Sequence, residues 1–115
     1  MTTTEPTVAV TTINVNGIRA AFRNGFAGWL QQWPPDVMLL QEVRAEEDIA
    51  SDLLGDDWSV FTYPSQLKGR AGVSIAVRKA SEAVSVADHE PLHGLSEEED
   101  APHSGRWIEL VLDTV

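Results

Sequence analysis

Four polar side chains, in two pairs, each follow a short run of apolar residues, and their types and spacing suit metal-ion chemistry. Asn14 and Asn16 come after one such run, and Gln41 and Glu42 come directly after a second. If the two runs form neighbouring parallel strands, all four side chains lie at the carboxyl edge of a sheet, where α/β proteins bind ligands. A carboxylate with amide oxygens and space for water is a donor set that suits Mg²⁺.

Simpler interpretations of these residues stay open. A Glu after a strand is more often a solvated loop residue, and an Asn such as Asn14 commonly caps the turn that follows it. Because the chain contains no Cys, thiol catalysis, disulfides and Cys-ligated zinc are excluded. His89 and His93 are four residues apart, but no third ligand accompanies them, so we expect no zinc site there.

A strand, a helix and a second strand are predicted to position the polar pairs. Val8 to Ile13 is short, β-branched and bounded by turn residues, which predicts a strand. Apolar residues at positions 22, 26, 29, 30 and 33 fall on one helical face, and Pro34 with Pro35 ends that helix. Val37 to Leu40 is a continuous apolar run, typical of a strand covered on both faces. Together these segments predict a βαβ unit with parallel strands.

The remainder of the chain predicts further strands and one more helix. We expect a helix from Glu46 to Leu54 that ends at Gly55. Residues 1–7 are expected to form a flexible tail and residues 88–105 an acidic, solvated loop. Further strands are expected over residues 58–63, 71–77, 81–87 and 106–112. Two helices cannot cover both faces of such a sheet, so we expect the chain to be part of a larger fold.

Composition and charge exclude several classes of protein. With 43% hydrophobic residues and four Trp, the chain can bury a core and is not intrinsically disordered. It has neither an apolar run of membrane-spanning length nor a secretory signal, and we expect a cytoplasmic protein with no membrane partner. The net charge is −10, but residues 1–80 hold nine acids and seven bases, whereas residues 81–115 hold nine acids and one base. The acidity is therefore local, and it does not exclude DNA as a partner of the first 80 residues.

Four short motifs occur in order along the chain. They are T-I-N-V-N-G-I-R-A from Thr12, P-D-V-M-L-L-Q-E from Pro35, G-R-A-G-V from Gly69 and S-G-R from Ser104. In this order and at these intervals they resemble the exonuclease III family of apurinic/apyrimidinic endonucleases. The resemblance implies an α/β fold that is a partial four-layer α/β/β/α sandwich. Residues 8–115 would form its first sheet and helices, as the N-terminal portion of an endonuclease/exonuclease/phosphatase-type domain.

The resemblance also implies roles for individual residues. Glu42 matches the metal-binding Glu of the family, and Asn14 matches the Asn that helps to hold the metal and orient the phosphate. Asn16 falls near the same metal, which would be Mg²⁺, with Mn²⁺ as the alternative. Basic residues placed to contact DNA phosphate are Arg19, Arg44, Lys68 and Arg70. Simpler roles stay open for these residues: Arg44 as a surface base at a helix start, Arg19 in an ion pair at the sheet edge, and Lys68 and Arg70 in a solvated loop.

The later catalytic parts of the family have no counterpart in this chain. They are a Tyr, an Asp-x-Asn pair and a terminal Ser-Asp-His, and Tyr63 precedes the G-R-A-G-V motif and so stands in the wrong order. We therefore expect an N-terminal fragment of a DNA repair nuclease, inactive alone, whose missing C-terminal half carries the general base. Its substrate would be double-stranded DNA with abasic or 3′-blocked sites. The alternatives are another phosphodiesterase of the superfamily, acting on RNA, inositol phosphates or sphingolipids, and a noncatalytic interaction fragment.

Overall fold

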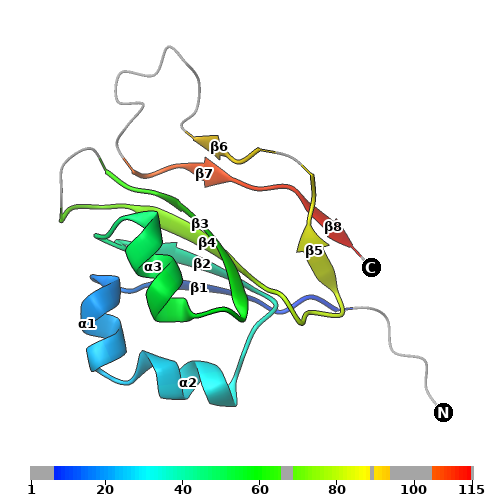
Figure 1. Ribbon diagram of the computed structural model, residues 1–115, viewed down its shortest axis with the longest axis horizontal. Helices are drawn as coiled ribbons and strands as arrows, with labels where there is room; N and C mark the ends of the chain where they lie inside the picture. The colour runs from blue at the N-terminus through cyan, green and yellow to red at the C-terminus, as the bar shows by residue number, and fades with distance from the viewer. Residues whose placement is uncertain (1–6, 66–68, 89, 94–104, 115) are drawn as a thin grey trace.

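Three helices lie on one side of a central sheet, and short strand pairs lie on its other side (Figure 1). The computed structural model describes residues 7–65, 69–88, 90–93 and 105–114. Residues 1–6 of the expected tail lie outside the described residues, as do Lys68, His89 and most of the expected acidic loop. Within the described part of the chain, no helix is both long and apolar enough to cross a membrane. The expected α/β class is confirmed.

The first two strands form the expected βαβ unit. β1 (Val10–Asn14) and β2 (Val37–Gln41) pair in parallel along their whole length. The connection between them contains α1 (Ile18–Arg23) and α2 (Phe26–Gln32). Because the two strands run in the same direction and in register, the residues that follow them emerge at one edge of the sheet.

The prediction of one continuous helix up to Trp33 is wrong, because the chain divides at Asn24 and Gly25. Gly25 has a φ of 102°, a left-handed conformation that interrupts an α-helix and that glycine adopts readily. The backbone N–H of Asn24 donates to the carbonyl of Ala20 at 3.0 Å and closes α1. As a result Trp29 and Trp33 are 40% and 68% exposed instead of sharing a buried face.

Two antiparallel strands complete the central sheet, which has the order β1-β2-β4-β3. β4 (Val73–Arg78) pairs with β2 on one side and with β3 (Trp58–Tyr63) on the other. α3 (Glu47–Leu54) precedes β3 and packs on the same face as α1 and α2. Gly55 follows α3 at a φ of 89°, so the expected end of this helix is confirmed.

The main core lies between the helices and the sheet. Alternation along β2 sends Met38 and Leu40 to this side, where both are almost completely buried. The helices contribute Ile18, Leu30 and Leu54 to the same cluster. Burial of such side chains provides most of the free energy that holds a helix layer on a sheet, at roughly 25 cal/mol per Å² of apolar surface.

The other face of the sheet is covered only in part. Val37 and Ile75 pack against apolar residues of the C-terminal segment, whereas Leu39 between them is 37% exposed. The strand expected over residues 106–112 is divided, and a further strand occurs within the expected acidic loop. The strand pairs on this face are β5 (Val84–Val86) with β8 (Leu112–Thr114), and β6 (Leu92–His93) with β7 (Ile108–Glu109).

Candidate functional site

The carboxyl ends of β1 and β2 bring the two polar pairs together, as predicted. Asn14 stands opposite Gln41 in the parallel register. The ladder continues past the strand ends, since the N–H of Val15 donates to the carbonyl of Gln41 at 3.0 Å. The N–H of Gly17 donates to the carbonyl of Glu42 at 2.7 Å. The two connecting loops are therefore fixed to each other by backbone hydrogen bonds.

The Asn14 side chain caps the turn that follows β1 and remains exposed. Its Oδ1 accepts a hydrogen bond from the N–H of Asn16 at 3.0 Å, and Asn16 has a φ of 48°. Asn14 therefore caps the turn, which is the simpler of the two roles expected from its sequence position. This role leaves the second lone pair of the Asn14 oxygen available, because an amide oxygen can accept two interactions.

Glu42 and Arg44 both adopt left-handed backbone conformations on either side of a buried residue. Their φ values are 50° and 55°, and Val43 between them is 0% exposed. The guanidinium of Arg44 lies 3.8 Å from the carboxylate of Glu42, and both side chains are 41% exposed. At this distance and exposure the ion pair contributes little to stability, so the Glu42 carboxylate is available to another cation.

A cavity of about 230 Å³ borders Glu42. Its wall includes Gln41, Gly72, Gly105 and Arg106, which belong to three separate segments of the chain. The Gln41 amide is held by its donation to Thr12 Oγ1 at 2.8 Å and to the carbonyl of Leu39 at 3.0 Å. The wall of this cavity therefore combines a charged carboxylate with an oriented amide.

Two glycines hold the loops around this cavity in close contact. The N–H of Gly72 donates to the carbonyl of Gly105 at 2.9 Å, and the carbonyl of Gly72 accepts from the N–H of Val43 at 2.9 Å. A Cβ at Gly105 would lie 2.7 Å from Cα of Ser65 and 2.9 Å from the carbonyl carbon of Pro64, and would also clash with the Ser65 nitrogen. The glycines in the G-R-A-G-V and S-G-R motifs thus allow three segments to meet, a role that the sequence analysis did not assign.

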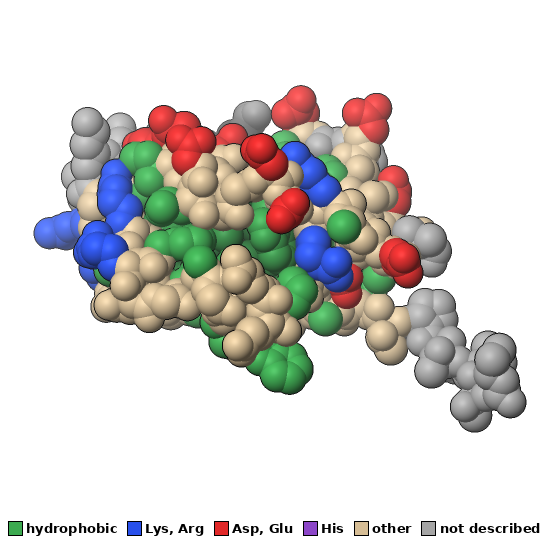
Figure 2. Space-filling model, turned by 60° about the horizontal axis from the view of Figure 1, so that its bottom comes forward, with side chains coloured by type: hydrophobic (Ala, Val, Ile, Leu, Met, Phe, Trp, Pro, Cys, Tyr) green, Lys and Arg blue, Asp and Glu red, His purple; other side chains and the backbone are tan. Residues whose placement is uncertain are grey.

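A second cavity, of about 250 Å³, is lined by three of the four expected phosphate contacts. These are Arg19 from the start of α1, Arg44 from the loop after β2, and Arg70 from the loop before β4. Figure 2 shows basic side chains gathered at the end of the molecule that carries α1. Neither Arg19 nor Arg70 forms an ion pair with any acid in the described part of the chain. Lys68, the fourth expected contact, lies outside the described residues.

The acidic and amide side chains at this edge of the sheet offer oxygen donors, which suit a hard divalent cation. Glu42 offers a carboxylate and Asn14 an amide oxygen, and Mg²⁺ commonly takes one or two protein carboxylates and keeps several waters. Among the described residues no group of three or more His, Asp or Glu side chains gathers to bind a metal ion. Glu42 and Asn14 therefore fit as protein ligands of a Mg²⁺ ion that keeps most of its water ligands.

Tyr63 and Asp36 lie at opposite edges of the sheet. Because β2 and β3 both run antiparallel to β4, Tyr63 ends β3 at the same edge as Gln41, two strands away, whereas Asp36 precedes β2 at the other edge. Tyr63 is 7% exposed at the end of β3, opposite Val73. The Asp36 carboxylate, at the start of β2, accepts hydrogen bonds from the N–H of Ala9 at 2.8 Å and from Ser81 Oγ at 2.7 Å. These two hydrogen bonds and the Arg78 guanidinium lower the pKa of Asp36 below its usual 3.8, against the effect of burial. The Asp of the P-D motif is therefore structural, which the sequence analysis did not predict.

The fold and this edge define an α/β protein with acidic and amide side chains at the carboxyl ends of parallel strands, next to an arginine-lined cavity. The Endonuclease/Exonuclease/phosphatase family matches residues 11–112. The chain therefore belongs to this family, which confirms the resemblance found in the motifs.

Solved structures of DNA-processing enzymes share the fold. A 3′ phosphatase, NExo from Neisseria, bound to product DNA hairpin, is 23% identical with a TM-score of 0.65, covering 92% of this chain and 38% of that one. The AP endonuclease LMAP from Leishmania major is 18% identical with a TM-score of 0.63, covering 90% and 34%. An AP endonuclease from Archaeoglobus fulgidus is 28% identical with a TM-score of 0.56, covering 90% and 37%. The chain thus spans little more than a third of the length of these proteins.

Proposed function

We propose that this chain is the N-terminal part of a magnesium-dependent DNA repair nuclease of the exonuclease III type. Its reaction would be hydrolysis of phosphodiesters at abasic sites in duplex DNA and removal of nucleotides or blocking groups from 3′ ends. The observation that carries the proposal is the placement of Glu42 and Asn14 at one sheet edge beside a cavity lined by three arginines. Membership of the family and the DNA-processing activities of the structural neighbours support it.

In this proposal the residues at the edge divide the work. Glu42 and Asn14 hold the cation, which is Mg²⁺ or alternatively Mn²⁺, and Asn16 lies next to them. When bound, the cation supplies charge neutralisation at the scissile phosphate. Asn14 orients a phosphate oxygen through its amide, while Arg19 and Arg44 bind neighbouring phosphates with planar guanidinium groups that can donate two hydrogen bonds at once.

The proposal includes inactivity of the isolated chain. In the described residues, no general base faces the cavity beside Glu42, whose remaining wall is Gln41, glycine, small apolar residues and Arg106. A water that attacks a phosphate in line needs a group that orients it and accepts its proton. We therefore expect no incision of an abasic duplex by residues 1–115 in the presence of Mg²⁺, and incision that depends on Mg²⁺ would contradict this part of the proposal.

Magnesium binding by the isolated chain tests the proposed metal ligands directly. In a Mg²⁺ titration followed by ¹H–¹⁵N NMR, we expect the side-chain amide of Asn14 and the backbone amide of Glu42 to shift in a saturable manner. Glu42→Gln should remove these shifts because it deletes the carboxylate. Glu82→Gln, at an exposed Glu after β4, is the matched control and should leave them unchanged. Equal shifts in Glu42→Gln would refute the assignment of Glu42.

DNA binding tests the arginine cavity. With a fluorescent duplex that carries an abasic analogue, Arg19→Ala and Arg70→Ala should each weaken binding and lower the slope of log K against log salt by about 1. Arg23→Ala is the control, because this exposed arginine ends α1 without lining the cavity. Equal losses in all three variants would indicate general attraction of DNA to positive charge and would contradict a defined phosphate site.

If the reading frame continues beyond Val115, the longer product offers the direct assay of activity. We expect it to incise abasic duplex DNA with Mg²⁺ and to lose that activity in Glu42→Gln. Assays with 3′-phosphorylated DNA and with RNA would separate the DNA repair reaction from the other phosphodiesterase reactions of the superfamily. Activity on RNA alone would replace DNA as the substrate in this proposal.

A further inference from the structure

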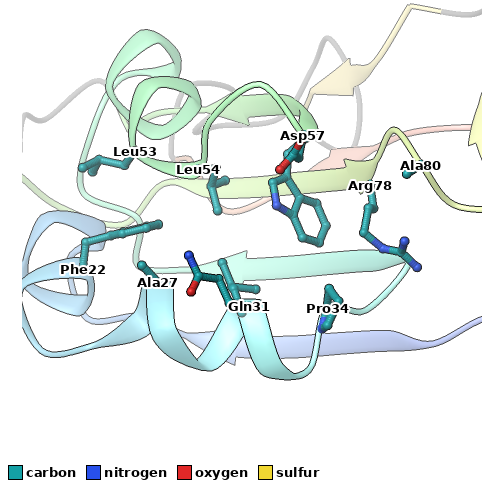
Figure 3. A pocket seen from close by; sticks show the side chains of 11 residues that line it. Phe22, Ala27, Gln31, Pro34, Leu53, Leu54, Asp57, Arg78 and Ala80 are labelled. Atoms are coloured by element: carbon teal, nitrogen blue, oxygen red, sulfur yellow. The ribbon is translucent and has the colours of Figure 1, made fainter.

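An apolar groove runs between α2 and α3 on the outer, helical face of the molecule. It encloses about 540 Å³, a size typical of sites that bind small molecules or peptide side chains. Figure 3 shows Leu53 and Leu54 reaching into it from α3, and Ala27 and Gln31 from α2. Other apolar residues of its wall are Phe22, Leu30, Pro34 and Trp58.

The groove lies away from the proposed catalytic edge. Two residues of its wall lie near the starts of strands, since Pro34 comes shortly before β2 and Asp57 directly before β3. Glu42 follows the opposite end of β2. The groove is on the helical face, while the partly open face of the sheet around Leu39 is on the other side. A molecule in the groove would therefore leave the site at Glu42 accessible.

The charges around the groove favour a basic occupant. Residues 46–57, which form α3 and the turn after it, contain six acids and no base. In the described residues Asp57, in the wall, has no ion pair, whereas the guanidinium of Arg78 is matched by Asp36 at 3.0 Å. Lys79 adds one positive charge next to Arg78, and residues 24–35, which include α2, contain no charged residue. Figure 2 shows the hollow lined by apolar side chains, with acidic side chains along its upper border.

The dimensions of the groove favour a short amphipathic helix. α2 has seven residues and is about 10 Å long at 1.5 Å per residue. A helix whose apolar residues stand at i, i+4 and i+7 presents an apolar edge of the same length, and such helices commonly occupy apolar grooves. Trp33 follows α2 directly and is 68% exposed, which adds apolar surface next to Pro34 at one end.

We propose that the groove between α2 and α3 binds an amphipathic helix of a partner protein, with apolar residues at i, i+4 and i+7 and Lys or Arg on its flanks. Nucleic acid and anionic membrane are disfavoured, because both would face the acids of α3. A second copy of this chain is also disfavoured, because each copy carries a net charge of −10. The proposal concerns a different surface from the proposed nuclease site and does not depend on its activity.

The test uses labelled peptides and the chain of residues 1–115. The probe is a fluorescein-labelled helical peptide of 14 residues with Leu at i, i+4 and i+7 and Lys or Arg at its flanking positions. The first control peptide replaces the three Leu with Ser and keeps the charge, and the second replaces the basic residues with Glu. We expect saturable anisotropy binding of the probe, and binding of each control peptide weaker by at least tenfold.

Variants then locate the binding. Asp57→Lys should weaken binding of the probe peptide at least fivefold. Asp113→Lys makes the same charge change on β8 and should alter the affinity for the probe less than twofold. Ala27→Arg places bulk and positive charge at an exposed helical position in the groove, where a folded variant is expected, and should weaken the probe at least tenfold.

Three results would overturn the proposal. The first is equal binding of the probe and the Ser-substituted peptide, which would reflect only attraction of a basic peptide to an acidic protein. The second is unchanged binding to Ala27→Arg in a variant whose circular dichroism matches the parent. The third is concentration-dependent dimerisation in sedimentation that Ala27→Arg abolishes, which would assign the groove to a second copy of the chain.

Discussion

The carboxylate of Asp36 joins three segments of the chain, and its replacement by Asn should be among the most costly single changes. It accepts hydrogen bonds from the N–H of Ala9, from Ser81 Oγ and from Arg78 Nη2 at 2.8, 2.7 and 3.0 Å. The Asp36 and Arg78 side chains are only 12% and 28% exposed, so water cannot fully replace these contacts. In Asp36→Asn the amide oxygen can replace one carboxylate oxygen, but the NH₂ group then faces another donor.

The expected cost follows from these contacts. One hydrogen bond to a charged acceptor contributes about 1.5–3 kcal/mol. The Arg78 guanidinium also loses its ionic partner in a partly buried position, which raises the cost further. We expect Asp36→Asn to lower the free energy of unfolding by about 3 kcal/mol at pH 6, measured by urea denaturation. Asp88→Asn, at an exposed acid, should change it by less than about 0.5 kcal/mol.

The pH dependence distinguishes the charge from the shape of the side chain. The pKa of Asp36 in the folded chain is lowered, so its ionisation stabilises the fold above the unfolded pKa of about 3.9. That stabilisation is lost as the pH falls through the lower pKa of the folded state. Asn does not titrate, so the difference between parent and variant should narrow between pH 6 and pH 2.5. A difference below about 1 kcal/mol at pH 6, or one that stays constant over this range, would refute the reasoning.

Three further substitutions test the backbone and the buried polar contacts, each by urea denaturation. Gly105→Ala should cost about 3 kcal/mol, because its Cβ would clash with Pro64 and Ser65 and its φ is 71°. Gly25→Ala has no atom within 4 Å of the new Cβ and should cost only about 1–2 kcal/mol for its left-handed φ; a cost equal to that of Gly105→Ala would contradict the clash. Ser74→Ala breaks the buried 2.7 Å hydrogen bond with Thr62 and should cost about 1–3 kcal/mol. Adding Thr62→Val to Ser74→Ala should recover part of that loss, since no hydroxyl then remains buried without its partner.

The βαβ unit could be predicted because its signals are local. The β-branched and apolar runs define β1 and β2, and the connection is long enough for a crossover. The division of the helix at Gly25 was missed because the apolar spacing passes through the break. A glycine within a helical pattern is compatible with both a continuous and an interrupted helix. The C-terminal strands differ from expectation for a related reason, since their division is set by pairing with distant segments.

The candidate site was predictable only where it depends on strand direction. Parallel pairing alone places Asn14 beside Gln41 and Glu42, so their proximity follows from the fold class. The convergence of Arg19, Arg44 and Arg70 depends instead on the position of α1 and on the paths of two loops, for which the sequence holds no periodic signal. The same limit applies to Gly72 and Gly105, whose contact joins segments far apart in sequence. Their roles need the three-dimensional arrangement.

The two left-handed residues on either side of Val43 have a consequence for how this site can vary. Glu42 lines one cavity and Arg44 the other, while Val43 is completely buried between them. A change in the volume of residue 43 would therefore shift both charged side chains at once, in a correlated way. If Glu42 binds the cation and Arg44 binds phosphate, as proposed, substitutions of the buried residue between them should alter both affinities together.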